Sequence, residues 1–413
     1  MSARFIPIPL SLLLMVSCSR SVSAQAITYD FETHPLNQGW YFAGAVGWTT
    51  AQAHSPTHSV LVSDFFGSPL VDYPDGTYVA VDFYSLNAPA SSSVEYGFGF
   101  QPLSAGPGWQ LNTYTFRSKG LDAVLRVDFW GDGSHYIDDV TIRPVSRPAA
   151  AAIQDANIAK FMPRPFVFTP PTNRHDAIAN SIGRLQNGQP LNVVMVGDSI
   201  IHDTFSTFFD PRVDRNYPTG ARLNVHEVVA SGAGAGYWSQ NNRIRDQVMT
   251  LNPQLLVFGG VSTPISDIPL FGEMIRQARA INPSVEIVLM SPVAGDFDNP
   301  YLFPTLAQPF DPVNGTDYRA QLFRFAQQQG AQFWDMTTPW ASYILNSGQP
   351  YSYFLRDGVH MNGYGDMLTG QIVAAYFYPV PEPSSLALVL LAGAAAVVSR
   401  RRKLVRSRWC GRR

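Results

Sequence analysis

A serine and a histidine stand in two short motifs that could together perform nucleophilic catalysis. Gly197-Asp198-Ser199 follows directly on the apolar run 193–196, and Asp357 stands three residues before His360. A serine hydroxyl is a weak nucleophile until a histidine accepts its proton, and that histidine needs a third group to hold its tautomer. The motifs therefore supply a candidate nucleophile (Ser199), a candidate base (His360) and a candidate orienting carboxylate (Asp357).

Neither motif alone indicates catalysis. Gly, Asp and Ser are all common in tight turns, and an isolated Asp three residues before a His is a still weaker signal. Their combination favours catalysis, since Ser199 comes at the carboxyl end of an apolar strand, where open α/β sheets place their sites. His202 could also reach such a site, yet we interpret His202 and Asp203 as surface residues at the start of a helix. We interpret Asp198 as the residue that caps the nucleophile turn.

The elements that must position these residues alternate between strand and helix. Apolar runs predict strands at 191–196, 224–229, 255–258, 285–290 and 331–334. Helical patterns lie between them, near 243–251, 271–281 and 318–329. This βα alternation is typical of a parallel sheet covered by helices.

These blocks resemble the GDSL or SGNH hydrolase family over residues 191–378. The resemblance implies a three-layer α/β/α fold and a carboxylic ester hydrolase that uses Ser199, His360 and Asp357 as its triad, with no cofactor for catalysis. It also implies an amphipathic helix after His360.

The same family completes its oxyanion hole with a Gly and an Asn. The Gly belongs to the segment 230–236, where we choose Gly232 over the glycines at 234 and 236. In the Asn position this chain has Ser262. A serine hydroxyl can donate a hydrogen bond to an oxyanion, but it is shorter than the Asn amide and rotates freely. Losing such a donor typically costs about 100- to 1,000-fold in rate.

The region before this domain has a different sequence pattern. Short alternating segments at 77–83, 94–100, 110–116 and 125–129 predict an antiparallel β-sandwich over residues 27–145. Clusters at 30–32, 39–40, 58–61, 108–109 and 136–140 resemble galactose-binding-like jelly-roll modules of the carbohydrate-binding kind.

That second resemblance implies two kinds of ligand. Such modules often hold a structural calcium, for which Glu32 and Asp139 are the candidate ligands, although paired acids at a strand end are more often simply solvated. Aromatic rings could stack on sugars or pack in the core, and sequence does not choose between these roles for Trp40, Trp48, Trp109 and Trp130.

Residues 146–189, rich in Pro and Ala at their start, predict an extended, semi-rigid linker with a short helix at 176–185 before the hydrolase domain at 190–379.

Both ends of the chain resemble export signals. Residues 1–24 have an apolar stretch and a small-residue cleavage site, the layout of a signal peptide. Residues 380–413 contain Pro381-Glu382-Pro383, an apolar run at 386–398 and a basic tail. This closely resembles the PEP-CTERM sorting signal of Gram-negative bacteria, which implies an exosortase-type protease as partner and transient membrane contact. The alternative is a plain C-terminal transmembrane helix, for which the run is short.

Composition bounds the remaining possibilities. A chain of 413 residues predicts two or three domains. Its two cysteines, Cys18 and Cys410, lie in the terminal segments, so we expect no disulfide and no thiol chemistry in the folded body. Eight of the 29 basic residues lie at 400–413, so the rest of the chain holds 21 bases against 31 acids. An acidic body argues against nucleic acid as a partner.

Together these observations predict an exported esterase of the cell envelope or extracellular matrix that hydrolyses O-acyl esters, O-acetyl foremost, on polysaccharide. The alternative is a weak or inactive protein of the same fold that binds glycans, with Ser262 as the sign of lost catalysis.

Overall fold

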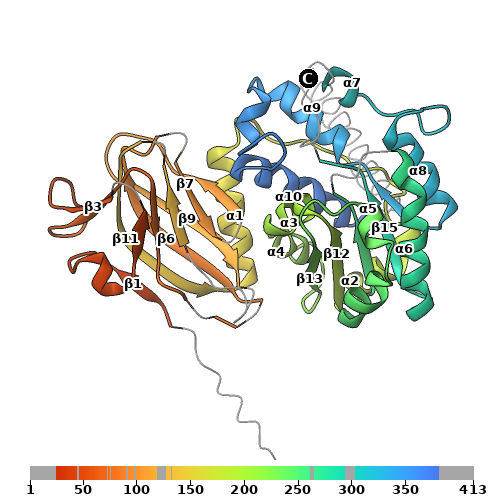
Figure 1. Cartoon of the computed structure of the whole chain (residues 1–413), viewed down its shortest axis with the longest axis horizontal. Coiled ribbons are helices and arrows are strands. Elements are labelled where there is room, and N and C mark those ends of the chain that lie inside the picture. The colour runs from red at the N-terminus through yellow and green to blue at the C-terminus, as the bar shows by residue number, and fades with distance from the viewer. Residues whose placement is uncertain are drawn as a thin grey trace, which may run out of the picture.

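The chain folds into two bodies that lie side by side (Figure 1). The structure, a computed structural model, describes residues 25–43, 46–71, 73–74, 76–89, 92–96, 99–118, 127–131, 133–260, 265–293 and 303–380. The first body is a sandwich of antiparallel sheets and the second has a parallel sheet between helices. This confirms the predicted fold class, a β-sandwich followed by a three-layer α/β/α domain.

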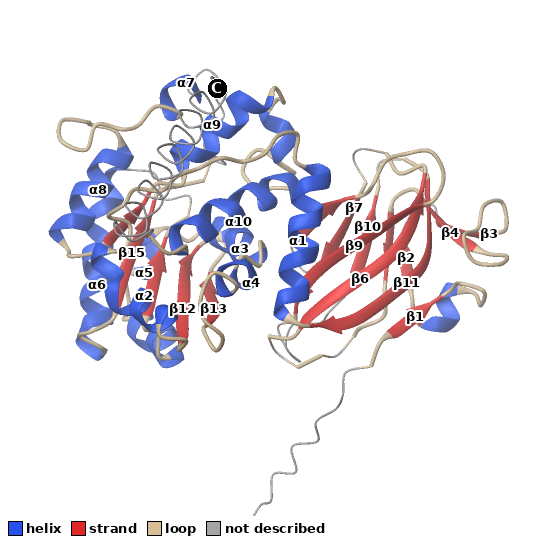
Figure 2. Cartoon of the chain, turned by 180° about the vertical axis from the view of Figure 1, so that it is seen from behind, coloured by secondary structure: helices blue, strands red, loops and turns tan. Residues whose placement is uncertain are grey.

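Two antiparallel sheets form the sandwich (Figure 2). The first contains β1 (Ile27–Tyr29), β3 (Val46–Thr49), β4 (Ser59–Val62), β6 (Tyr78–Leu86), β9 (Gln110–Arg117) and β11 (His135–Val145). The second contains β2 (Tyr41–Ala43), β5 (Phe65–Gly67), β7 (Ser93–Tyr96), β8 (Gly99–Pro102) and β10 (Val127–Trp130). A short 3-10 helix, η1 (Pro35–Gln38), follows β1. The segment 94–100, predicted as one strand, belongs to two strands, because β7 and β8 pair antiparallel as a hairpin.

Aromatic side chains fill the space between these two sheets. Trp40 is 1% exposed and stacks on Phe66 with ring centroids 4.4 Å apart, while the ring of Phe129 lies 6.2 Å from that of Phe66 and 6.3 Å from that of Trp40. Such rings bury large apolar areas and so dominate the stability of a small core. Trp40 is therefore a core residue, and sugar stacking is excluded for it.

A helix, α1 (Arg147–Phe161), connects the two bodies and lies between them in Figure 2. This corrects our expectation of an extended connection over these residues. Ser146 caps the helix by accepting a hydrogen bond from the Ala149 N–H, and Pro148 lies in the first turn, where its missing N–H costs nothing. The alanines that follow are the best helix formers, so the local signals favour a helix and not a linker.

The second body has a five-stranded parallel sheet in the order β13-β12-β14-β15-β16. Its strands are β12 (Pro190–Gly197), β13 (Arg222–Val229), β14 (Leu255–Phe258), β15 (Glu286–Met290) and β16 (Gln332–Trp334). Its α-helices are α2 (Ala179–Gln186), α3 (Ser199–Ser206), α4 (Asp210–Asp214), α5 (Ala235–Trp238), α6 (Ile268–Ile281), α7 (Phe303–Leu306), α8 (Tyr318–Gln328), α9 (Thr337–Ser347) and α10 (Gly363–Phe377). Shorter turns are the 3-10 helices η2 (Asp176–Ile178), η4 (Met249–Leu251), η5 (Ile265–Asp267) and η8 (Tyr351–Phe354), and the π-helical turn η3 (Ile244–Val248). The predicted helix at 243–251 is thus one π-helical and one 3-10 turn.

Residues of β12 point alternately into two cores, one on each face of the sheet. Val193 and Met195 join the core beneath α3 and α10, whereas Val194 and Val196 join the core beneath α5 and α6. A strand buried on both faces reads as a continuous apolar run, which is how β12 reads in the sequence. The sheet changes direction of winding between β12 and β14, and ligand sites of such sheets lie at the carboxyl ends of the strands there.

Helix α10 differs from the amphipathic helix that we expected after His360. All its residues are buried except Tyr364 and Gln371, which are partly exposed. It packs against α3, α4 and α9 on one side and against β8 of the sandwich on the other. Because the sandwich covers the side that would face water in an isolated domain, the helix needs no polar stripe.

Asp210 of α4 links the two bodies through a buried cluster of charges. The Tyr78 hydroxyl donates to Asp210 at 2.5 Å, and the Arg147 guanidinium lies 2.8 Å from the same carboxylate. Arg117 of β9 lies 3.4 Å from Asp210 and places its guanidinium carbon 4.1 Å from the centre of the Phe205 ring in α3. The sandwich, α1 and the α/β body therefore meet at one carboxylate.

We expect Asp210→Asn to lower the free energy of unfolding by about 3 kcal/mol, because it leaves the buried guanidinium of Arg117 without its counter-charge and removes one of the two carboxylates that pair with Arg147. Urea unfolding measures the change. Asp155→Asn is the matched control, since Asp155 also pairs with two arginines but is 37% exposed, and it should cost about 1 kcal/mol or less. Equal losses in both variants would contradict the role of Asp210.

Candidate active site

The turn after β12 presents Ser199 at the start of a helix. Asp198 is the N-cap of α3 and its carboxylate accepts a hydrogen bond from the Ile200 N–H at 2.9 Å. Ser199 is the first residue of α3. The interpretation of Asp198 as the cap is confirmed. The main-chain N–H of Ser199 lies among the unpaired donors of the helix N-terminus, where negative charge is stabilised.

Glycines allow the chain to approach closely at this turn. A Cβ atom on Gly197 would lie 2.4 Å from the carbonyl oxygen of Gly259, which follows β14. Gly260 has φ +123°, and a Cβ atom there would lie 2.6 Å from the Asp198 carboxylate. A side chain at either position would push β12 and β14 apart or displace Asp198, so these glycines shape the nucleophile turn.

Ser199, His360 and Asp357 form one chain of hydrogen bonds. The Ser199 Oγ is 2.9 Å from the His360 Nε2, and the His360 Nδ1 is 2.7 Å from an Asp357 carboxylate oxygen. The other Asp357 oxygen accepts hydrogen bonds from the main-chain N–H groups of Val359 at 2.7 Å and His360 at 2.6 Å. The structure thus brings the three predicted residues together in the order that can activate a hydroxyl for attack on a carbonyl carbon.

Hydrogen bonds keep Asp357 ionised. Partial burial opposes ionisation, but the hydrogen bonds from His360 and Val359 outweigh it, and the pKa of Asp357 lies below its usual value. The side chain of Asp357 is 50% exposed and that of His360 is 27% exposed. Ser199, His360 and Asp357, which we call the relay, therefore lie at the protein surface, with the carboxylate partly in water.

Asp203 is the residue that sequence reasoning missed. We interpreted it as a surface residue, but it is 1% exposed. Its carboxylate lies 3.0 Å from the Arg356 guanidinium and accepts a hydrogen bond from the Met361 N–H at 3.1 Å. Burial raises the pKa of Asp203 above its usual value, against the opposing effects of Arg356, His360 and the Met361 N–H.

Arg356 and Asn362 close the base of the loop that carries Asp357 and His360. The Arg356 N–H donates to the His360 carbonyl, and its guanidinium donates to the Met361 carbonyl at 2.7 Å. Asn362 caps α10 by accepting from the Tyr364 N–H at 2.9 Å, and its amide donates back to the Leu355 carbonyl. The loop is held on both sides of its two functional residues, which limits the motion of the imidazole.

Of the two predicted oxyanion donors, only Gly232 lies within the described residues. Gly232 lies in the loop after β13 with φ +66° and is exposed. Its loop is tied to the nucleophile turn, because the Ala230 N–H and the Trp238 ring N–H both donate to the Gly197 carbonyl. Ser262 lies outside the described residues. The roles of Gly232 and Ser262 remain predictions.

His202 pairs with an acidic residue of the neighbouring strand. Its Nδ1 lies 2.8 Å from the Glu227 carboxylate of β13, and both side chains are 13% exposed. His202 is thus a largely buried partner of Glu227. The interpretation of His202 as a surface residue was wrong, since α3 turns this side chain toward the neighbouring strand.

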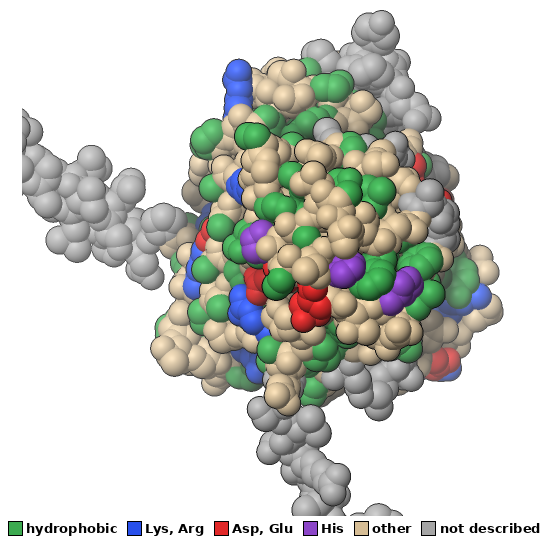
Figure 3. All heavy atoms as spheres, turned by 90° about the vertical axis from the view of Figure 1, so that its left-hand side faces the viewer, with side chains coloured by type: hydrophobic (Ala, Val, Ile, Leu, Met, Phe, Trp, Pro, Cys, Tyr) green, Lys and Arg blue, Asp and Glu red, His purple; other side chains and the backbone are tan. Residues whose placement is uncertain are grey.

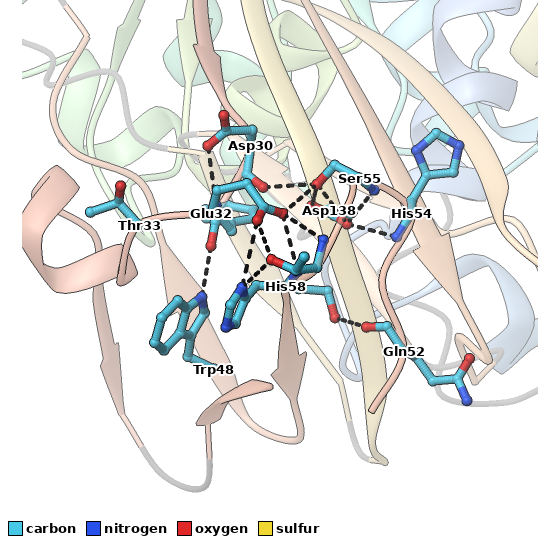
Figure 4. Close-up of polar contacts among 12 residues, drawn as sticks. Asp30, Glu32, Thr33, Trp48, Gln52, His54, Ser55, His58 and Asp138 are labelled. Carbon is cyan, nitrogen blue, oxygen red and sulfur yellow. Dashed lines mark hydrogen bonds and ion pairs between the residues drawn. The ribbon is translucent and has the colours of Figure 1, made fainter. Parts of the chain in front are cut away.

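Histidine and acidic side chains gather on the end of the sandwich that faces away from the α/β body (Figure 3). Figure 4 shows how the acids there hold the loop 52–58. Glu32 accepts hydrogen bonds from the main-chain N–H groups of Thr57 at 3.0 Å and His58 at 3.1 Å, and hydrogen bonding with Thr57 lowers its pKa to about 2. Asp138 accepts from the His54 N–H at 2.8 Å.

Glu32 and Asp139, the candidate ligands of a structural calcium, each have hydrogen-bond partners in this structure, and the calcium site stays a prediction. The Glu32 oxygens face N–H and O–H donors, and Asp139 lies 2.6 Å from the His54 ring instead of turning toward Glu32. Within the described residues, no group of three or more His, Cys, Asp or Glu side chains could hold a metal ion. The acids act here as acceptors that fix the loop.

Comparison with known proteins identifies the C-terminal segment. Residues 379–403 match the PEP-CTERM protein-sorting motif. The motif indicates an exported protein of the Gram-negative envelope type. No curated protein matches the sequence significantly.

The alternative prediction of a plain C-terminal transmembrane helix is wrong. The matched segment is a sorting motif, and none of the helices in the described part of the chain is long and apolar enough to cross a membrane. The apolar run 386–398 and the predicted signal peptide both lie outside the described residues.

Solved structures similar to this chain include enzymes and binding modules. A two-domain esterase active on acetylated mannans is 13% identical over 51% of this chain and 55% of its own, with a TM-score of 0.38. The chain thus spans little more than half the length of that esterase. The salicylyl-acyltransferase SsfX3 from a tetracycline biosynthetic pathway is 15% identical over 76% of this chain and 80% of its own, with a TM-score of 0.28. The xylan-binding CBM22-1 domain of Paenibacillus barcinonensis Xyn10C is 16% identical over 30% of this chain and 97% of its own, with a TM-score of 0.25.

We expect Asp203→Asn to lower the free energy of unfolding by about 2 to 3 kcal/mol and to shift the imidazole NMR signals of His360. The neutral amide leaves Arg356 without its counter-charge and turns a donor toward groups that already donate. Asp246→Asn, which breaks an exposed pair with Arg245, is the control and should change neither quantity. Unchanged His360 signals in Asp203→Asn would show that Asp203 does not position the imidazole.

Proposed function

We propose that this protein is a serine esterase. The observation that carries the proposal is the pair of hydrogen bonds, 2.9 and 2.7 Å long, that links Ser199 to His360 and His360 to Asp357. Ser199 is the nucleophile, His360 the general base and then the general acid, and Asp357 the group that holds the imidazole tautomer.

In the first half of the reaction, the Ser199 Oγ attacks the ester carbonyl carbon while the His360 Nε2 takes the hydroxyl proton. The tetrahedral intermediate collapses as the C–O bond to the alcohol breaks, and His360 returns the proton to the leaving alcohol. A water molecule then attacks the acyl-enzyme with the same base, which releases the acid and restores Ser199. The Ser199 N–H at the start of α3, Gly232 and Ser262 are the proposed donors to the oxyanion.

The exposure of the relay bears on the class of substrate. Asp357 is 50% exposed, and its neighbour Val359 is 36% exposed, so an ester carried on a bulky polymer can approach the site from the surface. A polysaccharide that carries small O-acyl groups, O-acetyl foremost, meets this requirement.

One face of the sandwich has the groups that recognise sugars. Trp130 is 37% exposed and packs on Phe65 with ring centroids 4.5 Å apart. Tyr41 lies over Gly67, where any Cβ atom would lie 2.5 Å from its ring, and its hydroxyl donates to Asp128 at 3.2 Å. Aromatic faces suit the C–H side of sugar rings, and carboxylates accept their hydroxyl hydrogen bonds. We propose that this face binds the polysaccharide.

Two further aromatic residues are weaker candidates for this role. Trp48 is 37% exposed, but its ring stacks on His58 at 4.0 Å and its N–H donates to the Phe31 carbonyl, so one face is already covered. Trp109 is partly buried and meets His54 edge to face.

The route of export completes the proposal. The PEP-CTERM motif at 379–403 implies an exosortase-type protease that recognises and removes the tail. A signal peptide at 1–24 would begin the same route. The ester substrate would then lie on polysaccharide of the cell envelope or extracellular matrix.

Ser199→Ala should lower the turnover of p-nitrophenyl acetate by at least about 1,000-fold, because it removes the nucleophile of the relay. The purified protein and the variant are compared spectrophotometrically. Ser284→Ala, which changes an exposed serine, is the matched control and should retain full turnover. If wild type and Ser199→Ala hydrolyse the ester at the same rate, the protein is not a serine esterase, and the inactive glycan-binding alternative is favoured.

Trp130→Ala should weaken binding to acetylated polysaccharide by about tenfold or more, since loss of a stacked ring costs roughly 1 to 2 kcal/mol, and should leave p-nitrophenyl acetate turnover unchanged. Affinity electrophoresis with acetylated mannan and xylan measures the binding. Leu111→Ala is the control, because Leu111 is 51% exposed and belongs to the other sheet. Equal binding by all three proteins would exclude this face as the sugar-binding surface.

A further inference from the structure

A small cavity lies where the sandwich, α1 and α10 meet. Its volume is about 40 Å³, enough for a bare ion with one or two waters but too small for a sugar ring. Residues of β8 and β9, of α1, of the α3–α4 connection and of α10 line it. The cavity is therefore built from both bodies of the protein.

Three residues that line this cavity have buried side-chain oxygen atoms with no hydrogen-bond partner. Thr115 Oγ1, Gln154 Oε1 and both carboxylate oxygens of Asp366 are buried and make no hydrogen bond to any described residue. Asp366 is 2% exposed and Thr115 is 7% exposed. Buried polar groups are nearly always paired in folded proteins, so four unpaired oxygens around one cavity indicate a missing partner.

The orientation of Gln154 shows which kind of partner is missing. Its amide nitrogen donates to the Phe208 carbonyl at 2.8 Å, so the acceptor oxygen Oε1 is the group of this side chain that lacks a partner. Arg212 also lines the cavity, but its Nε donates to Asp155 at 3.0 Å. The unpaired groups are one carboxylate, one amide oxygen and one hydroxyl, an oxygen set that suits a hard cation.

Charge indicates which cation. Asp366 and Asp203 lie close enough to repel each other, and burial together with Asp203 raises the pKa of Asp366 well above its usual value. Arg356 pairs with Asp203, so the ionised form of Asp366 requires a further positive charge. A single carboxylate balances one charge, whereas Ca²⁺ sites draw on several oxygens that are usually multiple carboxylates.

We propose that this cavity binds one alkali-metal cation, Na⁺ or K⁺, held by Asp366, Gln154 and Thr115. The site ties three elements together: β9 of the sandwich, α1 and the first turn of α10. Helix α10 begins three residues after His360, so the bound cation also supports the helix that follows the proposed base. The site is separate from the relay and does not depend on the esterase proposal.

Thermal unfolding of the full chain in NaCl, KCl or choline chloride, at equal ionic strength and pH 7, tests the proposal. We expect Na⁺ or K⁺ to raise the Tm saturably relative to choline, by about 2 °C or more. Sodium NMR line broadening on the wild-type protein gives a second, direct measure of binding. Equal Tm values in all three salts would overturn the proposal, and would indicate that Asp366 is simply protonated or that the cavity holds only water.

Two variants assign the effect to the cavity. Asp366→Asn should abolish the difference between alkali chloride and choline chloride, because the amide lacks the charge that selects a cation. Thr115→Val keeps the side-chain volume and the carboxylate, and should shift the salt titration to roughly tenfold higher concentration. Thr115→Val carries the test if Asp366→Asn does not fold, and an unchanged titration in that variant would overturn the proposal. Asp246→Asn, at an exposed ion pair, should keep the wild-type response.

Discussion

The buried carboxylate of Asp203 is the contact on which the geometry of the site depends. Ser199 and His360 are 161 residues apart in the sequence, so a contact between distant segments must set the distance between their side chains. Asp203 lies four residues after Ser199, on the same face of α3. It accepts a hydrogen bond from the N–H of Met361, the residue directly after His360. The contact between Ser199 and His360 is therefore repeated one helical turn deeper, where water does not compete.

The position of α3 depends in turn on the sandwich. Arg117 packs its guanidinium on Phe205 near the end of α3, and Asp210, four residues beyond that helix, gathers Tyr78, Arg117 and Arg147. Helix α10, which follows the loop that carries Asp357 and His360, is buried because β8 of the sandwich covers it. The sandwich thus packs against α3, α4 and α10 and is more than a module on a flexible tether. A polysaccharide bound to it would be held at a constant distance from Ser199.

The sequence predicted what depends on local patterns and missed what depends on distant contacts. The strands β12 and β14, the cap at Asp198 and the pairing of Asp357 with His360 each rest on neighbouring residues, and the structure has them. Helix α1 was not predicted although its signals are local. The prolines near Ala149 are typical of an extended linker, but the cap at Ser146 and the alanines favour a helix. The burial of Asp203 could not be read from its surroundings, since its partners lie more than 150 residues away. The calcium expectation came from resemblance and stays a prediction.

Asp203 contributes geometry more than charge to the proposed reaction. A buried carboxylate near an imidazole would ordinarily favour the protonated ring, and Asp203 does interact with the charge of His360. However, the Arg356 guanidinium lies 3.0 Å from the same carboxylate, so the field of the pair at His360 is much smaller than that of a lone acid. Stabilisation of the imidazolium then falls to Asp357, which is half exposed and therefore partly screened by water. A site built this way depends on accurate placement of Ser199 and His360, which the buried pair provides, while the surface acid keeps the proton on the correct nitrogen.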